Sequence, residues 1–167
     1  MKQRISNVLF FCAGNPECGI MAAALLNKWG AGRFRGFSAA GESGGGASAS
    51  MLELLKLHGL SIDDPTPDDP KRRPAPASAP MDFVITLCDR EADEDRQLSA
   101  EGAVTARWHI TKPAAHPGTS VERLEALRRA FCELENRVKL FVLVWDKARA
   151  QMPAAGLPRP EPAGNPP

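Results

Sequence analysis

The sequence lacks the features that mark several broad classes of protein. No stretch approaches the roughly 20 apolar residues that a membrane-spanning helix requires. The apolar run that follows the first residues is too short for a signal peptide. The formal net charge is +1 and charges of both signs are interspersed, so no nucleic-acid-binding surface is expected. The one basic run, 71–73, lies among prolines and is interpreted as a solvated loop.

Cysteine and histidine are also scarce. The 4 cysteines are too few and too scattered for a disulfide framework, which favours a reducing, cytoplasmic setting. The 3 histidines share no metal-ligand spacing with the cysteines: His58, His109 and His116. No nucleotide-binding fingerprint occurs either. We therefore expect no metal and no cofactor.

Short apolar runs alternate with helical patterns along most of the chain. The apolar runs predict four strands, at 7–11, 34–39, 82–87 and 105–110. Helices are expected at 19–29, from about 51 to 59, and from 119 onwards. Alternating strands and helices indicate an α/β protein with a parallel sheet and helices on both faces. We assign residues 1–148 to one domain, with 63–81 as a proline-rich surface loop and 149–167 as a disordered tail.

The last helix has the clearest pattern. Thr119 and Glu122 have the spacing of a capping box, in which the side chain of each residue accepts a hydrogen bond from the backbone N–H of the other. Apolar residues then recur every three or four positions and predict one core-facing stripe: Val121, Leu124, Leu127, Phe131, Leu134, Val138, Phe141 and Trp145. In the second helix the same spacing places Met51, Leu54, Leu55 and Leu57 on one side.

Two cysteines stand where strands end. Cys12 follows the first apolar run and Cys88 follows the third. Ligands of parallel sheets bind outside the carboxyl ends of the strands, so both thiols are candidate site residues. For each, the alternative is a small buried thiol that closes a strand, the usual place of a free cysteine.

Several segments together resemble the low-molecular-weight protein tyrosine phosphatase superfamily, and within it the arsenate reductases. In chain order they are VLFFCAGN, the helix with MAAALL, FSAAG, MDFVITLCD, W-H-I-x-K-P and the last amphipathic helix. They span 7–145. The resemblance implies a flavodoxin-like, three-layer fold whose four-stranded parallel sheet has the order 2-1-3-4.

The resemblance also implies an anion-binding loop after the first strand. In that family a nucleophilic cysteine is followed by five residues, an arginine and a serine or threonine. Loop amides and a helix N-terminus surround the oxyanion, and the arginine binds two of its oxygens. Here Cys12 takes the place of the nucleophile. The following loop positions are Ala13, Gly14, Asn15, Pro16, Glu17, Cys18 and Gly19.

The loop departs from this pattern at several positions. Cys18 stands in the place of the arginine, and a thiol has neither the fixed charge nor the five donors of a guanidinium. Gly19 stands in the place of the serine. Pro16 lacks an N–H and restricts the backbone of Asn15. Glu17 either brings a carboxylate to the anion site, or points to solvent or stabilises the helix start.

Two further family positions lie later in the chain. The phosphatase Asp-Pro acid is replaced by Lys112-Pro113; a lysine is a poor acid, and a solvated loop lysine is the alternative. Cys88 matches the second redox cysteine of the reductases, while the acidic segment 89–95 has no third. A relay through Cys12 and Cys88, with Cys18 as a substitute, is conceivable. Cys132 is interpreted as structural.

These departures lead to three functional hypotheses. The first is an arsenate reductase or phosphatase homologue with impaired or lost turnover. The second is a working thiol-dependent enzyme that uses Cys12, and the third is a redox-responsive thiol protein. The partners implied by the resemblance are an oxyanion such as phosphate or arsenate, or a phosphoprotein, and a thioredoxin-like or small-thiol reductant.

Overall fold

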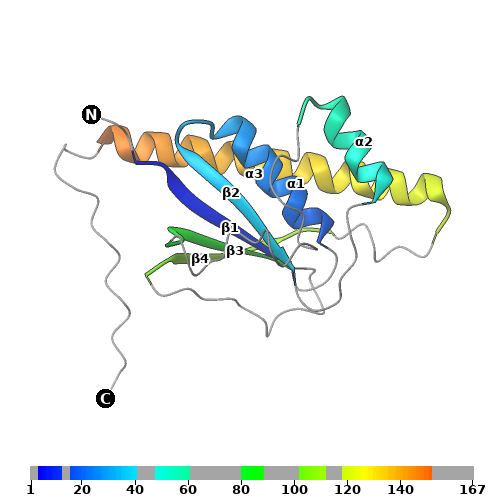
Figure 1. Ribbon diagram of the computed structural model, residues 1–167, viewed down its shortest axis with the longest axis horizontal. Helices are drawn as coiled ribbons and strands as arrows, with labels where there is room; N and C mark the ends of the chain where they lie inside the picture. The colour runs from blue at the N-terminus through cyan, green and yellow to red at the C-terminus, as the bar shows by residue number, and fades with distance from the viewer. Residues whose placement is uncertain are drawn as a thin grey trace, which may run out of the picture.

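The described residues of the computed structural model form four strands and three helices (Figure 1). The structure describes residues 4–12, 16–40, 48–60, 80–88, 102–111 and 118–151. The elements are β1 (Ser6–Cys12), α1 (Glu17–Trp29), β2 (Phe34–Ala40), α2 (Ala49–Leu57), β3 (Phe83–Cys88), β4 (Val104–His109) and α3 (Ser120–Gln151). Every predicted strand is present, and its ends lie within one residue of the expected positions.

The four strands form one parallel sheet with the order β2-β1-β3-β4, which confirms the order implied by the resemblance. β1 lies between β2 and β3, so the Cα partners of Cys12 are Ala40 and Leu87. A central parallel strand is covered on both faces, which explains why β1 and β3 read as continuous apolar runs. Because all strands run the same way, their carboxyl ends meet at one edge.

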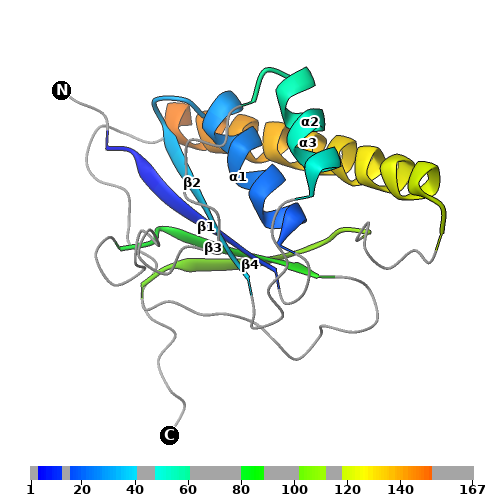
Figure 2. The same cartoon turned by 45° about the vertical axis from the view of Figure 1, so that its right-hand side comes forward.

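The two faces of the sheet carry separate core clusters. Side chains alternate along each strand, and Val8, Phe10 and Cys12 of β1 join the main cluster together with residues of all three helices. The three helices lie on this side of the sheet (Figures 1 and 2). The second face carries a smaller cluster, formed by Leu9, Phe37, Met81 and Val84. We expected helices on both faces, but within the described residues all three helices lie on the first face.

α1 lies unusually close to β2. A Cβ atom placed on Gly36 would stand 2.9 Å from the Ala23 carbonyl oxygen, so a larger residue there would push the helix from the strand. The Asn27 side chain also binds the Gly36 backbone at both groups: Gly36 N donates to Oδ1 at 2.8 Å, and Nδ2 donates to Gly36 O at 3.3 Å. This contact fixes α1, and therefore its first turn, relative to the sheet.

α3 begins with the predicted capping box. Thr119 N donates to Glu122 Oε2 at 2.8 Å, and Glu122 N donates to Thr119 Oγ1 at 3.4 Å. The predicted stripe is buried along its middle, at Leu127, Phe131, Leu134 and Val138. Val121 was wrongly placed in this stripe: it is 65% exposed, because the first turn of α3 lies beyond the core.

Two helix ends also differ from the sequence-based expectation. Leu57 is 72% exposed and not on the buried side of α2, because it is the last residue of that helix. α3 continues to Gln151 and so includes the first residues of the segment 149–167, which we had assigned to a tail. Alanine, arginine and glutamine favour helix, which explains the extension. Residues 152–167 lie outside the described residues, as does most of 63–81.

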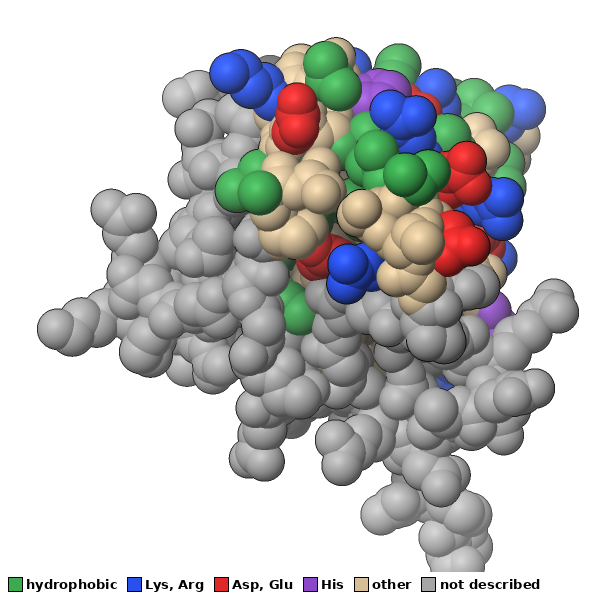
Figure 3. Space-filling view, turned by 90° about the vertical axis from the view of Figure 1, so that its right-hand side faces the viewer, with side chains coloured by type: hydrophobic (Ala, Val, Ile, Leu, Met, Phe, Trp, Pro, Cys, Tyr) green, Lys and Arg blue, Asp and Glu red, His purple; other side chains and the backbone are tan. Residues whose placement is uncertain are grey.

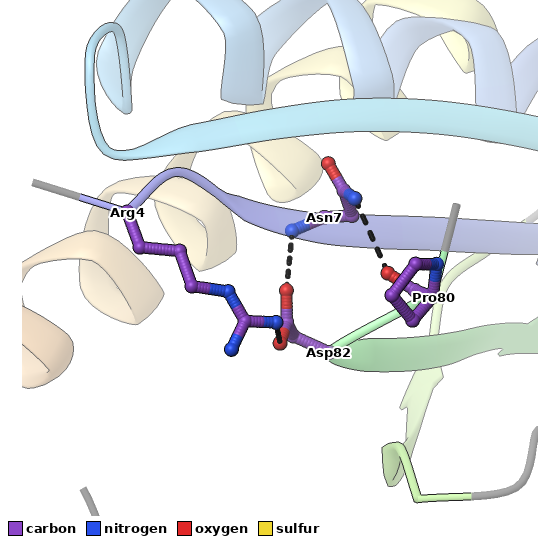
Figure 4. Close-up of polar contacts among 4 residues, drawn as sticks. All are labelled: Arg4, Asn7, Pro80 and Asp82. Atoms are coloured by element: carbon purple, nitrogen blue, oxygen red, sulfur yellow. Dashed lines mark hydrogen bonds and ion pairs between the residues drawn. The ribbon is translucent and has the colours of Figure 1, made fainter. Parts of the chain in front are cut away.

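The amino ends of β1 and β3 are joined by Asp82 (Figure 4). Its carboxylate accepts from Asn7 N at 2.8 Å and from the Arg4 guanidinium at 2.7 Å. The Asn7 side chain donates in turn to the Pro80 carbonyl at 3.2 Å. These contacts lie at the edge of the sheet opposite Cys12. They fix the register of the two central strands, and with it the positions at which Cys12 and Cys88 end them.

Candidate active site

Cys12 and Cys88 both end strands at the carboxyl edge of the sheet. Cys12 is the last residue of β1 and its side chain is fully buried (0% exposed). Cys88 is the last residue of β3, where its Cα pairs with that of His109. The side chain of Cys88 lies outside the described residues, as do the loop positions Ala13, Gly14 and Asn15 and the acid position Lys112.

The helix after the loop begins earlier than expected. α1 starts at Glu17 and not at Gly19, and Pro16 is its N-cap, with φ −68° and ψ −13°. The Pro16 carbonyl accepts from Ile20 N at 3.0 Å, the first bond of the helix. Proline suits a helix start because its ring fixes φ at a helical value and its missing N–H has no partner there anyway. Pro16 therefore begins α1 without a side-chain hydrogen bond to its amides.

Gly19 lies close to the Cys12 sulfur. A Cβ atom placed on Gly19 would stand 3.7 Å from Cys12 Sγ and 3.5 Å from the Phe10 carbonyl oxygen, which are ordinary contact distances. The first turn of α1 thus comes down onto the end of β1. The position that holds a serine or threonine in the resembled family faces the thiol here too, but it has no hydroxyl to offer.

Glu17 is buried and belongs to two helix starts. It lies in the first turn of α1, it is 8% exposed, and its Oε1 accepts from Ser48 N at 3.1 Å. Ser48 is the N-cap of α2, and its hydroxyl accepts from Met51 N at 3.2 Å. A carboxylate near a helix N-terminus is favoured by the helix dipole. The alternative in which Glu17 points to solvent is therefore wrong, and the helix-start alternative agrees with the structure.

Cys18 is fully buried (0% exposed) and is part of the main core cluster. In the resembled family this position holds the guanidinium that binds the oxyanion. The turn that follows Cys12 therefore presents a thiol packed among apolar side chains and a carboxylate already bound by an amide. Residues 16–19 contain no cationic side chain.

In the described part of the surface at this end of the molecule, charges of both signs are present. Viewed from the right-hand side of Figure 1, basic and acidic side chains are interspersed with hydrophobic ones (Figure 3). Within the described ranges, no group of three or more potential ligands is placed to hold a metal ion. No helix among them is long and apolar enough to cross a membrane.

Sequence reasoning missed Ser48. It lies 31 positions from Glu17, and its only signal was that of a serine before a helical pattern, which marks a cap. That pattern predicts the bond to Met51 N. It does not reveal that the Ser48 amide binds a carboxylate of another helix.

Solved structures of arsenate reductases share this fold, although no family model matches the chain. The arsenate reductase of Archaeoglobus fulgidus is 27% identical, with 81% of this chain and 98% of that chain covered and a TM-score of 0.58. An arsenate reductase in the phosphate binding state is 19% identical, with coverage of 84% and 98% and a TM-score of 0.63. The thioredoxin-dependent arsenate reductase of Corynebacterium glutamicum is 21% identical, with coverage of 89% and 64% and a TM-score of 0.55.

These similarities confirm the resemblance to the arsenate reductase branch of the low-molecular-weight phosphatase superfamily, and they confirm the α/β fold. The phosphate-binding state and the thioredoxin dependence are properties of those two proteins.

Proposed function

We propose that this protein is an arsenate reductase or low-molecular-weight phosphatase homologue whose oxyanion turnover is impaired or lost. The observation that carries the proposal is the first turn of α1. Its backbone begins beside the Cys12 sulfur, as an oxyanion cradle requires, but its side chains are a buried thiol, Cys18, and a carboxylate, Glu17.

Chemistry at Cys12 depends on the thiolate and on the charge of the oxyanion. A thiolate is stabilised by a helix N-terminus and by nearby cations. The N-terminus of α1 supplies the first, since the helix starts five residues after Cys12, the end of β1. Residues 16–19 supply no cation. The charged side chain of this turn, Glu17, is an acid whose carboxylate accepts from Ser48 N, so it offers an oxyanion no positive charge.

The missing guanidinium sets the size of the expected defect. Hydrogen bonds to charged groups contribute about 1.5–3 kcal/mol each, and an arginine makes two of them to an oxyanion. Since each 1.36 kcal/mol in the barrier is a factor of ten in rate, the loss of both bonds lowers turnover by roughly 10²- to 10⁴-fold. A residue at position 18 that is packed in the core does not replace them.

The family chemistry implies two partners. The oxyanion would be phosphate or arsenate, free or on a phosphoprotein, and the reductant would be a thioredoxin-like protein or a small thiol. The Cys12 thiol would be the nucleophile. In a reductase, Cys88 would then form a disulfide with Cys12. Lys112 stands in the place of the acid and would be a poor proton donor for the leaving group.

A turnover assay tests the proposal against its main alternative, a working enzyme that depends on Cys12. Hydrolysis of an aryl phosphate and arsenate-dependent oxidation of a thiol reductant are measured for the wild-type protein and for Cys12→Ser. The two proteins are expected to give the same slow background. Cys12-dependent turnover at rates typical of enzymes, 1 s⁻¹ or more, would show that the cradle works without its arginine.

A further inference from the structure

Two buried polar atoms on the second face of the sheet have no hydrogen-bond partner within the described part of the chain. They are Oγ1 of Thr86 in β3 and Nε of Arg107 in β4. Thr86 is 1% exposed, so water does not reach its hydroxyl from bulk solvent. The two residues are Cα partners in the parallel β3–β4 pair, and register partners project to the same face. The two side chains therefore leave the sheet side by side on that face.

This pair is separate from the Cys12 loop. Cys12 projects into the main core under the helices, whereas Thr86 alternates with Ile85 and Leu87 and so projects to the opposite face. Thr86 and Arg107 each lie two residues before the end of their strand. The pair is thus at the carboxyl edge of the sheet, where ligands of parallel sheets bind, but on the other side.

The sheet offers Arg107 no counter-charge. The four strands contain no acidic residue. Asp82 precedes Thr86 by four residues, about 13 Å along an extended strand. Its carboxylate already binds Arg4 and the Asn7 amide. Arginine cannot shed its proton, and a buried donor left without an acceptor destabilises the fold, more so when it is charged.

We propose that Thr86 and Arg107 bind a small anion on the second face of the sheet. Arg107 Nε–H and a neighbouring Nη–H present the two parallel donors that a carboxylate or tetrahedral oxyanion accepts, and the Thr86 hydroxyl is a third donor. Such a ligand supplies only acceptors, which is what both orphaned groups need. Because the site does not involve Cys12 or α1, its existence does not depend on the proposed function.

The test is an anion titration followed by NMR and by thermal unfolding. Phosphate, sulfate and acetate are added separately at millimolar concentration, with chloride at matched ionic strength as the reference. The probes distinguish a tetrahedral oxyanion from a planar carboxylate. The Arg107 Nε–H signal and the Thr86 amide report the site directly. At least one anion is expected to shift both signals saturably and to raise Tm.

Four variants make the result specific. Arg107→Met should abolish the shift of the Thr86 amide, and Arg107→Lys should weaken it because the charge remains but the Nε–H is lost. Thr86→Val should weaken binding about tenfold, the contribution of one hydrogen bond to a charged group. Without anion it should be no less stable than wild type, because a methyl group replaces an unpaired hydroxyl. Arg35→Met, at an exposed arginine of the other edge strand, is the matched control and should bind normally.

Two results would overturn the proposal. One is the absence of a saturable shift with all three anions. The other is a rise in Tm that is the same in Arg107→Met and Arg35→Met, since sulfate and phosphate also stabilise proteins non-specifically.

Discussion

The starts of α1 and α3 solve the same problem in opposite ways. Every helix begins with amides that have no partner within the helix. At α3, Thr119 and Glu122 close the first turn with two reciprocal side-chain bonds. At α1, Pro16 makes no side-chain bond to the helix, as expected where the amides face a ligand. Yet the side chains that follow, Glu17 and Cys18, do not favour an anion.

The comparison shows that the position of α1 and the side chains of its first turn are separate features. The close approach of Gly19 to Cys12 comes from the packing of α1 on β2, through Gly36 and Asn27. These contacts do not involve the side chain at position 18. The packing of α1 beside Cys12 therefore does not require a cation at that position.

The largest effect is expected from adding that cation. Cys18→Arg buries a guanidinium in an apolar cluster and should lower the free energy of unfolding by about 3–5 kcal/mol, measured by urea denaturation. Phosphate should recover only part of this loss, because Pro16 and Glu17 remain. The matched control is Cys132→Arg on the exposed side of α3, which should change stability by about 0.5 kcal/mol or less. A Cys18→Arg protein as stable as wild type would show that position 18 opens toward the site.

A smaller effect is expected from removing the carboxylate that joins α1 and α2. Glu17→Ala leaves the Ser48 amide without its acceptor and should cost about 1–3 kcal/mol. Glu17→Gln keeps an acceptor oxygen and should cost less than Glu17→Ala. The measurement is again urea denaturation. Equal losses for the two variants would mean that charge, and not the hydrogen bond to Ser48, is what matters at this position.

The smallest effect is the direct test of the two helix starts. Thr119→Ala removes a capping side chain from α3 and should cost about 1 kcal/mol. Pro16→Ala removes no such bond, so its cost should be no more than about 0.5 kcal/mol. Both are measured by thermal unfolding. If Pro16→Ala costs as much as Thr119→Ala, the ring of Pro16 stabilises the start of α1 to the same degree as a cap.

Much of the fold could be read from the sequence, because the deciding signals are local. The apolar runs of β1 and β3 reflect burial on both faces, and the Thr119–Glu122 spacing is itself the capping box. Val121 was misplaced because periodicity shows which side of a helix is apolar but not where the core beneath it ends. The start of α1 was misplaced because Pro16 was interpreted as a disturbance of the loop and not as a helix start.

The candidate site was less predictable because its contacts join distant positions. Cys12 and Cys18 could be named from their spacing, but the burial of Cys18 depends on how α1 lies on the sheet. The Ser48 contact of Glu17 and the pairing of Thr86 with Arg107 depend on packing and strand register. Neither leaves a pattern in the sequence.

The central claim is that the first turn of α1 has the backbone of an oxyanion cradle but not its charge. The most direct measurement is a phosphate titration of the wild-type protein that follows the backbone amide signals of residues 17–19 by NMR. This readout is independent of any binding at Arg107, which has its own signals. We expect no saturable change at these amides up to several times 1 mM phosphate. Any binding would therefore be far weaker than a micromolar Kd. A saturable shift of the Cys18 and Gly19 amides that is absent with chloride at matched ionic strength would contradict the claim.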